Sequence, residues 1–126
     1  MGDRGNIIIK ADKECFKHQV VFYTHWSGSD LPHIVRNALI RGRDRWNDSP
    51  YLARIIFSEL IKDSIEELAG FGISTEIGDG EDQIVNVFMK ERKVTFHKTF
   101  KLPSMTFEEL VSTELSGWRN SDDTDE

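Results

Sequence analysis

The sequence of 126 residues contains a single cysteine, Cys15, and only three prolines. One cysteine excludes an internal disulfide and a zinc site built from several cysteines of one chain. Its scarcity is typical of a reducing compartment, so we expect a cytoplasmic location. No apolar run is long enough to predict a membrane span, and the polar first residues do not predict a signal peptide.

Local motifs of common catalytic and metal sites are also missing. No GxSxG motif surrounds a serine, and the four histidines show no HExxH or HxH spacing. Residues 78–81 resemble a glycine-rich phosphate loop, but their acidic side chains would repel an anion, and we interpret them as a hairpin turn. We therefore expect no bound metal and no cofactor.

The net charge of −6 argues against binding to duplex nucleic acid, which usually requires a basic surface. Apolar residues make up 38% of the chain and charged residues 30%, an ordinary globular composition. The length predicts one domain, at 1–119. Residues 120–126 are acidic and have no apolar side chain, so we expect them to form a disordered tail.

Apolar spacing and turn signals predict the secondary structure. We expect strands at 7–9, 20–25, 73–77, 84–89 and 93–97, and helices at 30–42, 50–70 and 106–115. The order is β-β-α-α-β-β-β-α, with a hairpin at the start and a three-stranded meander near the end. This order predicts an α+β domain with an antiparallel sheet of about five strands and helices mainly on one face.

Arginine is concentrated in the middle of the chain. Residues 23–54 contain five of the eight arginines and no lysine, namely Arg36, Arg41, Arg43, Arg45 and Arg54. This composition indicates bidentate binding of carboxylate or phosphate groups. Three aromatic residues of the same stretch, Trp26, Trp46 and Tyr51, offer surfaces on which a ring could stack. The alternative is a solvated polar face with ordinary ion pairs.

The turn between the second strand and the first helix is another candidate. Its residues are His25, Trp26, Ser27, Gly28 and Ser29. A helix start offers free N–H groups to an anion, and the serines could add hydroxyl donors. The alternative is a structural turn in which Ser29 caps the helix. If the protein is an enzyme, His25 is the best general acid or base.

Several segments carry a resemblance to other proteins. Residues 1–6, 23–32 (YTHWSGSDLP), 45–57 (beginning RW and ending YLARIIF) and 72–75 resemble small uncharacterised proteins found in phages and bacterial genomes. The resemblance covers roughly residues 1–97. It implies a short, cytoplasmic, phage-borne accessory protein, of a kind that often counters host defence and sometimes sequesters a nucleotide-derived signal.

Three hypotheses follow. The first is a binding module that holds a nucleotide-like or other small anionic ligand, with its pocket at the subunit interface of a homo-oligomer. The second is an inhibitor whose acidic surface and tail bind a basic host protein. The third is a nucleotide hydrolase or transferase that uses His25. The absence of a catalytic motif favours binding over catalysis.

Overall fold

The computed structural model describes residues 2–14, 19–78, 80–113 and 115. Its strands are β1 (Gly5–Lys10), β2 (Gln19–Thr24), β3 (Phe71–Ser74), β4 (Ile84–Phe88), β5 (Lys93–Phe96) and β6 (Met105–Thr106). Its α-helices are α1 (Leu31–Arg41), α2 (Ser49–Ile61) and α3 (Phe107–Ser112), and its short 3₁₀ helices are η1 (Gly28–Asp30), η2 (Arg43–Arg45) and η3 (Lys98–Phe100). The α+β class predicted from the sequence is confirmed.

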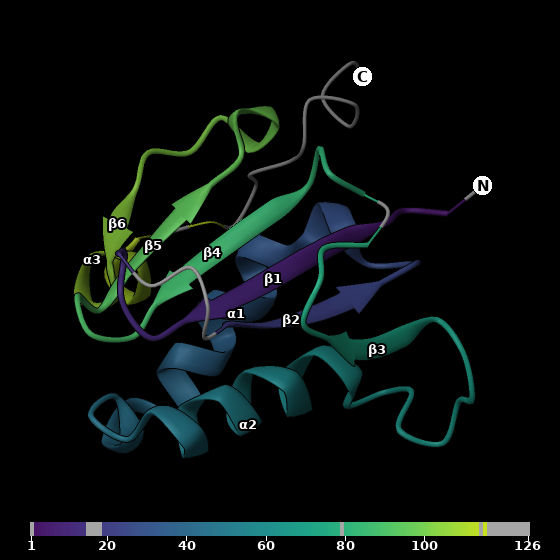
Figure 1. Cartoon of the computed structure of the whole chain (residues 1–126). Coiled ribbons are helices and arrows are strands. Elements are labelled where there is room, and N and C mark those ends of the chain that lie inside the picture. The colour runs from purple at the N-terminus through teal and green to yellow at the C-terminus, as the bar shows by residue number, and fades with distance from the viewer. Residues whose placement is uncertain (1, 15–18, 79, 114, 116–126) are drawn as a thin grey trace.

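The sheet has six strands in the order β3-β2-β1-β4-β5-β6 (Figure 1). β1 pairs with β2 in the expected antiparallel hairpin, but it pairs with β4 in parallel, so the sheet is mixed rather than antiparallel. The expected meander is wrong in part. β4 and β5 form a hairpin, whereas β3 pairs with β2 at the far edge of the sheet. Sequence adjacency did not indicate that the chain crosses the sheet between β3 and β4.

The core lies between one face of the sheet and the helices. Ile7 and Ile9 of β1 belong to it, together with buried residues from α1, α2 and α3. Ile8 is also buried, although it is not part of this core. Since successive residues of a strand point to opposite faces, both faces of β1 are shielded from water. This agrees with the central position that its three consecutive isoleucines predict.

The second α-helix is shorter than the sequence indicated. α2 ends at Ile61, and the chain continues through turns in which Ser64 N–H donates to Ile61 O at 2.8 Å and Glu67 N–H to Ser64 O at 3.0 Å. Ile65 and Leu68, whose spacing continues the apolar positions of the helix, are exposed. The predicted continuation of the helix to residue 70 is therefore wrong. The chain leaves the helix after Ile61 so that β3 can pair with β2.

Residues 120–126, expected to form a disordered tail, lie outside the described part of the chain. No helix within the described ranges is both long enough and apolar enough to cross a membrane.

Candidate functional site

The turn before α1 is occupied by the protein's own carboxylate. Asp3 accepts hydrogen bonds from the Ser29 backbone N–H at 3.0 and 3.1 Å and from the Ser29 hydroxyl at 2.6 Å. The side chain of Gln83 adds a third donor at 2.8 Å. Gly28 N–H donates to the Asp3 carbonyl at 2.7 Å. The carboxylate of Asp3 thus occupies the turn where the sequence suggested that an external anion could bind.

The electrostatics of Asp3 agree with this geometry. Burial alone would raise the pKa of the carboxyl, but the hydrogen bonds from Gln83 and Ser29 outweigh burial and hold the pKa below its usual value. Ser27 serves the turn in a different way, because its N–H donates to the Thr24 hydroxyl at 3.1 Å. We conclude that Ser27, Gly28 and Ser29 are structural residues of the turn.

The two aromatic residues of this turn differ in their surroundings. His25 stacks on Tyr23 with the ring centroids 5.6 Å apart. Trp26 makes an edge contact with Phe71 at 5.5 Å, yet 53% of its surface stays exposed. Trp26 is therefore a fixed aromatic surface at the end of β2.

Arg36 joins two helices. Its Nε donates to the carbonyls of Leu110 at 3.2 Å and Thr113 at 2.8 Å, and its Nη2 donates to the carbonyl of Val111 at 3.2 Å. These carbonyls lie at the carboxyl end of α3, where a helix leaves acceptors without intrahelical partners. The guanidinium of Arg36 thus caps α3 and is not available to a ligand.

Arg41 is also structural. Its Nε lies 3.1 Å from the carboxylate of Glu59, and its Nη2 donates to the Ser58 hydroxyl at 2.6 Å and the Ile55 carbonyl at 3.2 Å. Glu59 is buried and also accepts from Lys62 at 2.9 Å. The hydrogen bond from Lys62 and the charge of Glu59 raise the pKa of that lysine. Arg41 therefore compensates a buried charge between α1 and α2.

Arg43, Arg45 and Arg54 are exposed at the surface. Arg43 lies over the ring of Trp46 at 5.1 Å, and Arg45 lies over the ring of Tyr51 at 5.2 Å. Such cation–π contacts hold a guanidinium in place without using its hydrogen-bond donors. These arginines remain candidates for binding a ligand, in contrast to Arg36 and Arg41.

Trp46, which directly follows η2, is mostly buried. Its Nε1 donates to the Leu39 carbonyl at 3.0 Å, and its ring meets the edge of Phe107 at 5.4 Å. A cavity of about 340 Å³ opens beside this pair. It is lined by Trp46, Glu91, Arg92, Thr106, Phe107 and Glu108. Arg43 reaches the same place, because one of its nitrogens lies 3.6 Å from the Glu108 carboxylate.

The sequence did not predict the part of this cavity that the β4–β5 turn and α3 contribute. Arg92 forms the tight turn between β4 and β5 with a positive φ of 54°, and its carbonyl accepts the N–H of Phe107 at 2.8 Å. Nothing local in the sequence marks Arg92 as a neighbour of Trp46, since the two meet through their contacts with Phe107 of α3. Of the predicted site residues, Trp46 lines the observed cavity, and Arg43 contacts two of its lining residues, Trp46 and Glu108.

The structure does not unite the two predicted halves of the site. The Trp26 turn precedes α1 and Arg43 follows it, and a helix of 11 residues spans about 16 Å at 1.5 Å per residue. Arg54, on the second turn of α2, lines none of the hollows described here. A single ligand of nucleotide size is therefore not held by the Trp26 turn and the arginines together.

Two further hollows flank α2. One of about 460 Å³ has a mostly apolar lining that includes Val20, Pro50 and Met89. The other, of about 210 Å³, lies beside His33, Glu59 and Asp63. Within the described ranges no group of three or more His, Cys, Asp or Glu side chains is placed to hold a metal ion.

Comparison with protein-family models, with curated proteins and with solved structures finds no match to this chain.

Proposed function

We propose that this protein is a small cytoplasmic binding protein, encoded by a phage, that holds a nucleotide-like anion in the cavity between Trp46, Arg43 and Arg92. In this proposal it acts by sequestration, as an accessory protein that removes a host defence signal. The observation that carries the proposal is the pairing of exposed guanidinium groups with an aromatic wall around one cavity.

The guanidinium of Arg43 is held in position before a ligand binds. Arg43 stacks on Trp46, and its ion pair with Glu108 is long, at 3.6 Å, and exposed on both sides. Such a surface pair contributes at most about 1 kcal/mol, so a phosphate could displace the carboxylate. Arg92 lines the cavity and is exposed as well.

The cavity favours a ligand of low charge. Glu91 and Glu108 line it beside Arg92, so a polyphosphate would meet repulsion as well as attraction. Carboxylates accept hydrogen bonds from the N–H groups of a base and the hydroxyl groups of a ribose. A volume of about 340 Å³ is at the small end of ligand pockets. These properties fit a mononucleotide or a cyclic nucleotide with one or two charges.

Binding is a simpler proposal than catalysis for this cavity. His25, the best candidate for acid–base chemistry, belongs to the turn at the other end of α1 and stacks on Tyr23. It cannot act on a ligand held beside Trp46 without a large rearrangement. The ligand is therefore expected to leave the protein chemically unchanged.

The test is native mass spectrometry with a panel of linear, cyclic and NAD-derived nucleotides, followed by calorimetry of any nucleotide that binds. The same spectra give the number of subunits, and heat release of the ligand shows whether it was altered. Arg43→Ala and Arg92→Ala should each weaken binding at least about tenfold, the effect of losing a charge-assisted contact.

Arg54→Ala is the matched control, since Arg54 is an exposed arginine that does not line the cavity. Its affinity should stay within about twofold of the unchanged protein. Equal affinities for the Arg43, Arg92 and Arg54 variants would refute the site, and release of a converted nucleotide would refute simple sequestration.

A further inference from the structure

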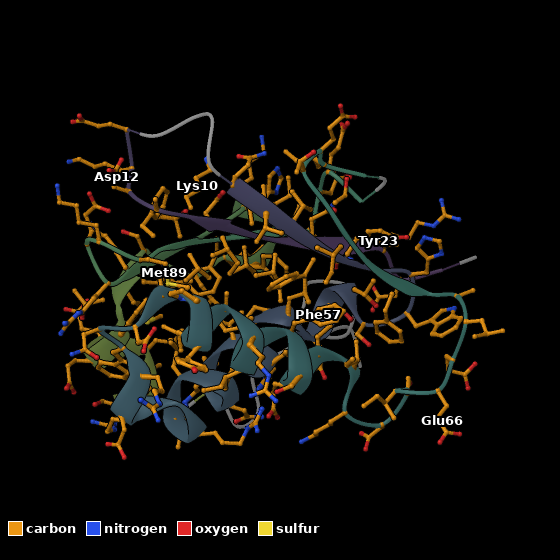
Figure 2. The ribbon with its side chains drawn as sticks, turned by 60° about the horizontal axis from the view of Figure 1, so that its bottom comes forward. Lys10, Asp12, Tyr23, Phe57, Glu66 and Met89 are labelled. Carbon is orange, nitrogen blue, oxygen red and sulfur yellow. The ribbon has the colours of Figure 1, made fainter. Side chains whose placement is uncertain are left out.

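β3 is an edge strand with one free side. Among the strands of the described residues it pairs only with β2, and it is the last strand of the sheet (Figure 1). Figure 2 shows the segment that enters β3 looping away from the body of the protein, with Glu66 at its outer end. An edge strand presents main-chain donors and acceptors that can pair with another chain.

The pairing register shows which main-chain groups face outward. His25 N–H donates to the Gly70 carbonyl at 2.8 Å, next to the pair of Thr24 in β2 and Phe71 in β3. Hydrogen-bonded and non-hydrogen-bonded pairs alternate along an antiparallel ladder. Gly72 therefore bonds to β2, whereas the N–H and C=O groups of Phe71 and Ile73 point away from it.

Two glycines fix aromatic rings against this edge. A Cβ on Gly70, which has a φ of +94°, would lie 2.3 Å from the ring of Trp26, and a Cβ on Gly72 would lie 2.4 Å from the ring of Tyr23. Only glycine lets the rings lie this close to the backbone. Trp26 is thus held rigidly beside the start of β3 although half of it is exposed.

Apolar side chains continue along the same edge. Ile73 is 57% exposed and Ile77 is 45% exposed, and Ile65 and Leu68 in the preceding connection are exposed as well. Natural edge strands are usually protected against pairing by lysine or proline. Residues 63–82 contain neither lysine, arginine nor proline. This edge therefore lacks the protection that lysine or proline would give.

The exposed residues that flank β3 in the chain carry charge of one sign. Glu66 and Glu67 precede the strand and Glu76 follows it, and residues 64–78 contain no lysine or arginine. A second copy that paired β3 with β3 would bring these like charges together, which is unfavourable. A basic partner would instead be attracted by them.

We propose that the free edge of β3 binds an extended segment of another protein in which lysine or arginine alternates with apolar residues, adding a strand to the sheet. The outward main-chain groups of Phe71 and Ile73 supply the hydrogen bonds. Because side chains of a strand alternate between faces, apolar residues of the partner lie against Ile73 on one face and its basic residues lie on the other. The site is separate from the cavity beside Trp46.

The test uses a fluorescein-labelled peptide of five lysine–valine repeats, with five glutamate–valine repeats as its counterpart. Fluorescence anisotropy at physiological salt measures affinity, and amide hydrogen exchange by NMR locates the contact. The basic peptide should bind and the acidic one should not. On binding, exchange should slow at the amides of Phe71 and Ile73, whereas that of Gly72 should change little.

Two substitutions at Ile73 test the edge. Ile73→Pro removes the outward N–H without removing a bond to β2, and Ile73→Lys places a positive charge at the edge. Each substitution should lower the affinity for the lysine–valine peptide at least tenfold. Ile40→Lys is the matched control, because Ile40 is an exposed isoleucine of α1, 43% exposed, away from the sheet edge. Its affinity should change less than twofold.

The proposal is overturned if Ile73→Lys, which is the variant less prone to disturb folding, binds the peptide as well as the unchanged protein. It is also overturned if exchange slows elsewhere, or if the glutamate–valine peptide binds equally well. Self-association that Ile73→Lys abolishes, without peptide binding, would show that a second copy occupies the edge instead.

Discussion

Replacing Arg36 by alanine should destabilise the fold and leave the proposed ligand cavity intact. The guanidinium holds three carbonyls at the end of α3, those of Leu110, Val111 and Thr113. The Leu110 carbonyl keeps a second donor, the N–H of Thr113 at 3.2 Å. The substitution therefore removes the cap from the Val111 and Thr113 carbonyls without a replacement from the same helix.

The size of the effect follows from these two acceptors. A buried acceptor left without a partner costs about 1–3 kcal/mol, and water can partly replace the side chain because Arg36 is half-buried. We expect a loss of about 2–3 kcal/mol in the free energy of unfolding. For a domain of this size this lowers the Tm by roughly 10 °C.

Urea denaturation followed by circular dichroism measures this loss directly. Arg36→Lys should recover only part of the stability, because one ammonium group cannot reach all three carbonyls in the geometry of a guanidinium. Arg54→Ala, at an exposed arginine of the same cluster, should shift the unfolding free energy by less than about 0.5 kcal/mol. Equal stabilities for Arg36→Ala and Arg54→Ala would refute the assignment of Arg36 as a helix cap.

Two further predictions concern the Trp26 turn and the residues that hold it. The pKa of Asp3 is lower in the folded protein than in the unfolded chain, so its carboxylate stabilises the fold above the unfolded pKa of about 3.9 and loses this contribution as the pH falls through the folded value. Asp3→Asn should therefore lower the free energy of unfolding at pH 7 and make it fall less steeply below about pH 5. Urea titrations from pH 7 to pH 2 measure both effects. Parallel pH curves for the two proteins would contradict this prediction. Gly70→Ala should cost more than about 1 kcal/mol, because it forces a positive φ on alanine and displaces the Trp26 ring, and the Trp26 fluorescence should shift to the red. An unchanged spectrum and an unchanged Tm would show that Gly70 does not hold the ring.

Local sequence signals determined much of the secondary structure. Pro32 and Pro50 stand in the first turns of α1 and α2, where a missing N–H removes no bond, and both helices begin there. The capping box of Thr106 and Glu109 is present with both of its hydrogen bonds. The hairpin of β1 and β2 is confirmed as well. The helix starts and the capping box depend on contacts within a few residues, which the sequence shows directly, and the hairpin joins two strands that are neighbours in the chain.

The sheet order depended on the tertiary structure. The same apolar alternation suits a strand at either edge, and nothing in the sequence distinguishes pairing of β3 with β2 from pairing with β4. The end of α2 at Ile61 has a similar cause. The apolar positions 65 and 68 continue the helical spacing, but the route of the chain to β2 decides where the helix stops.

The roles of the arginines also came from the tertiary structure. The sequence by itself shows that five arginines and three aromatic residues lie in one segment. Which guanidinium is available depends on partners far along the chain: Arg36 finds its carbonyls at residues 110–113, and Ser29 finds the carboxylate of Asp3. Hydrogen bonds between distant residues are made only when the chain folds, so composition indicated the chemistry of the segment. Packing decided that Arg43, rather than Arg36 or Arg41, contacts residues that line a cavity.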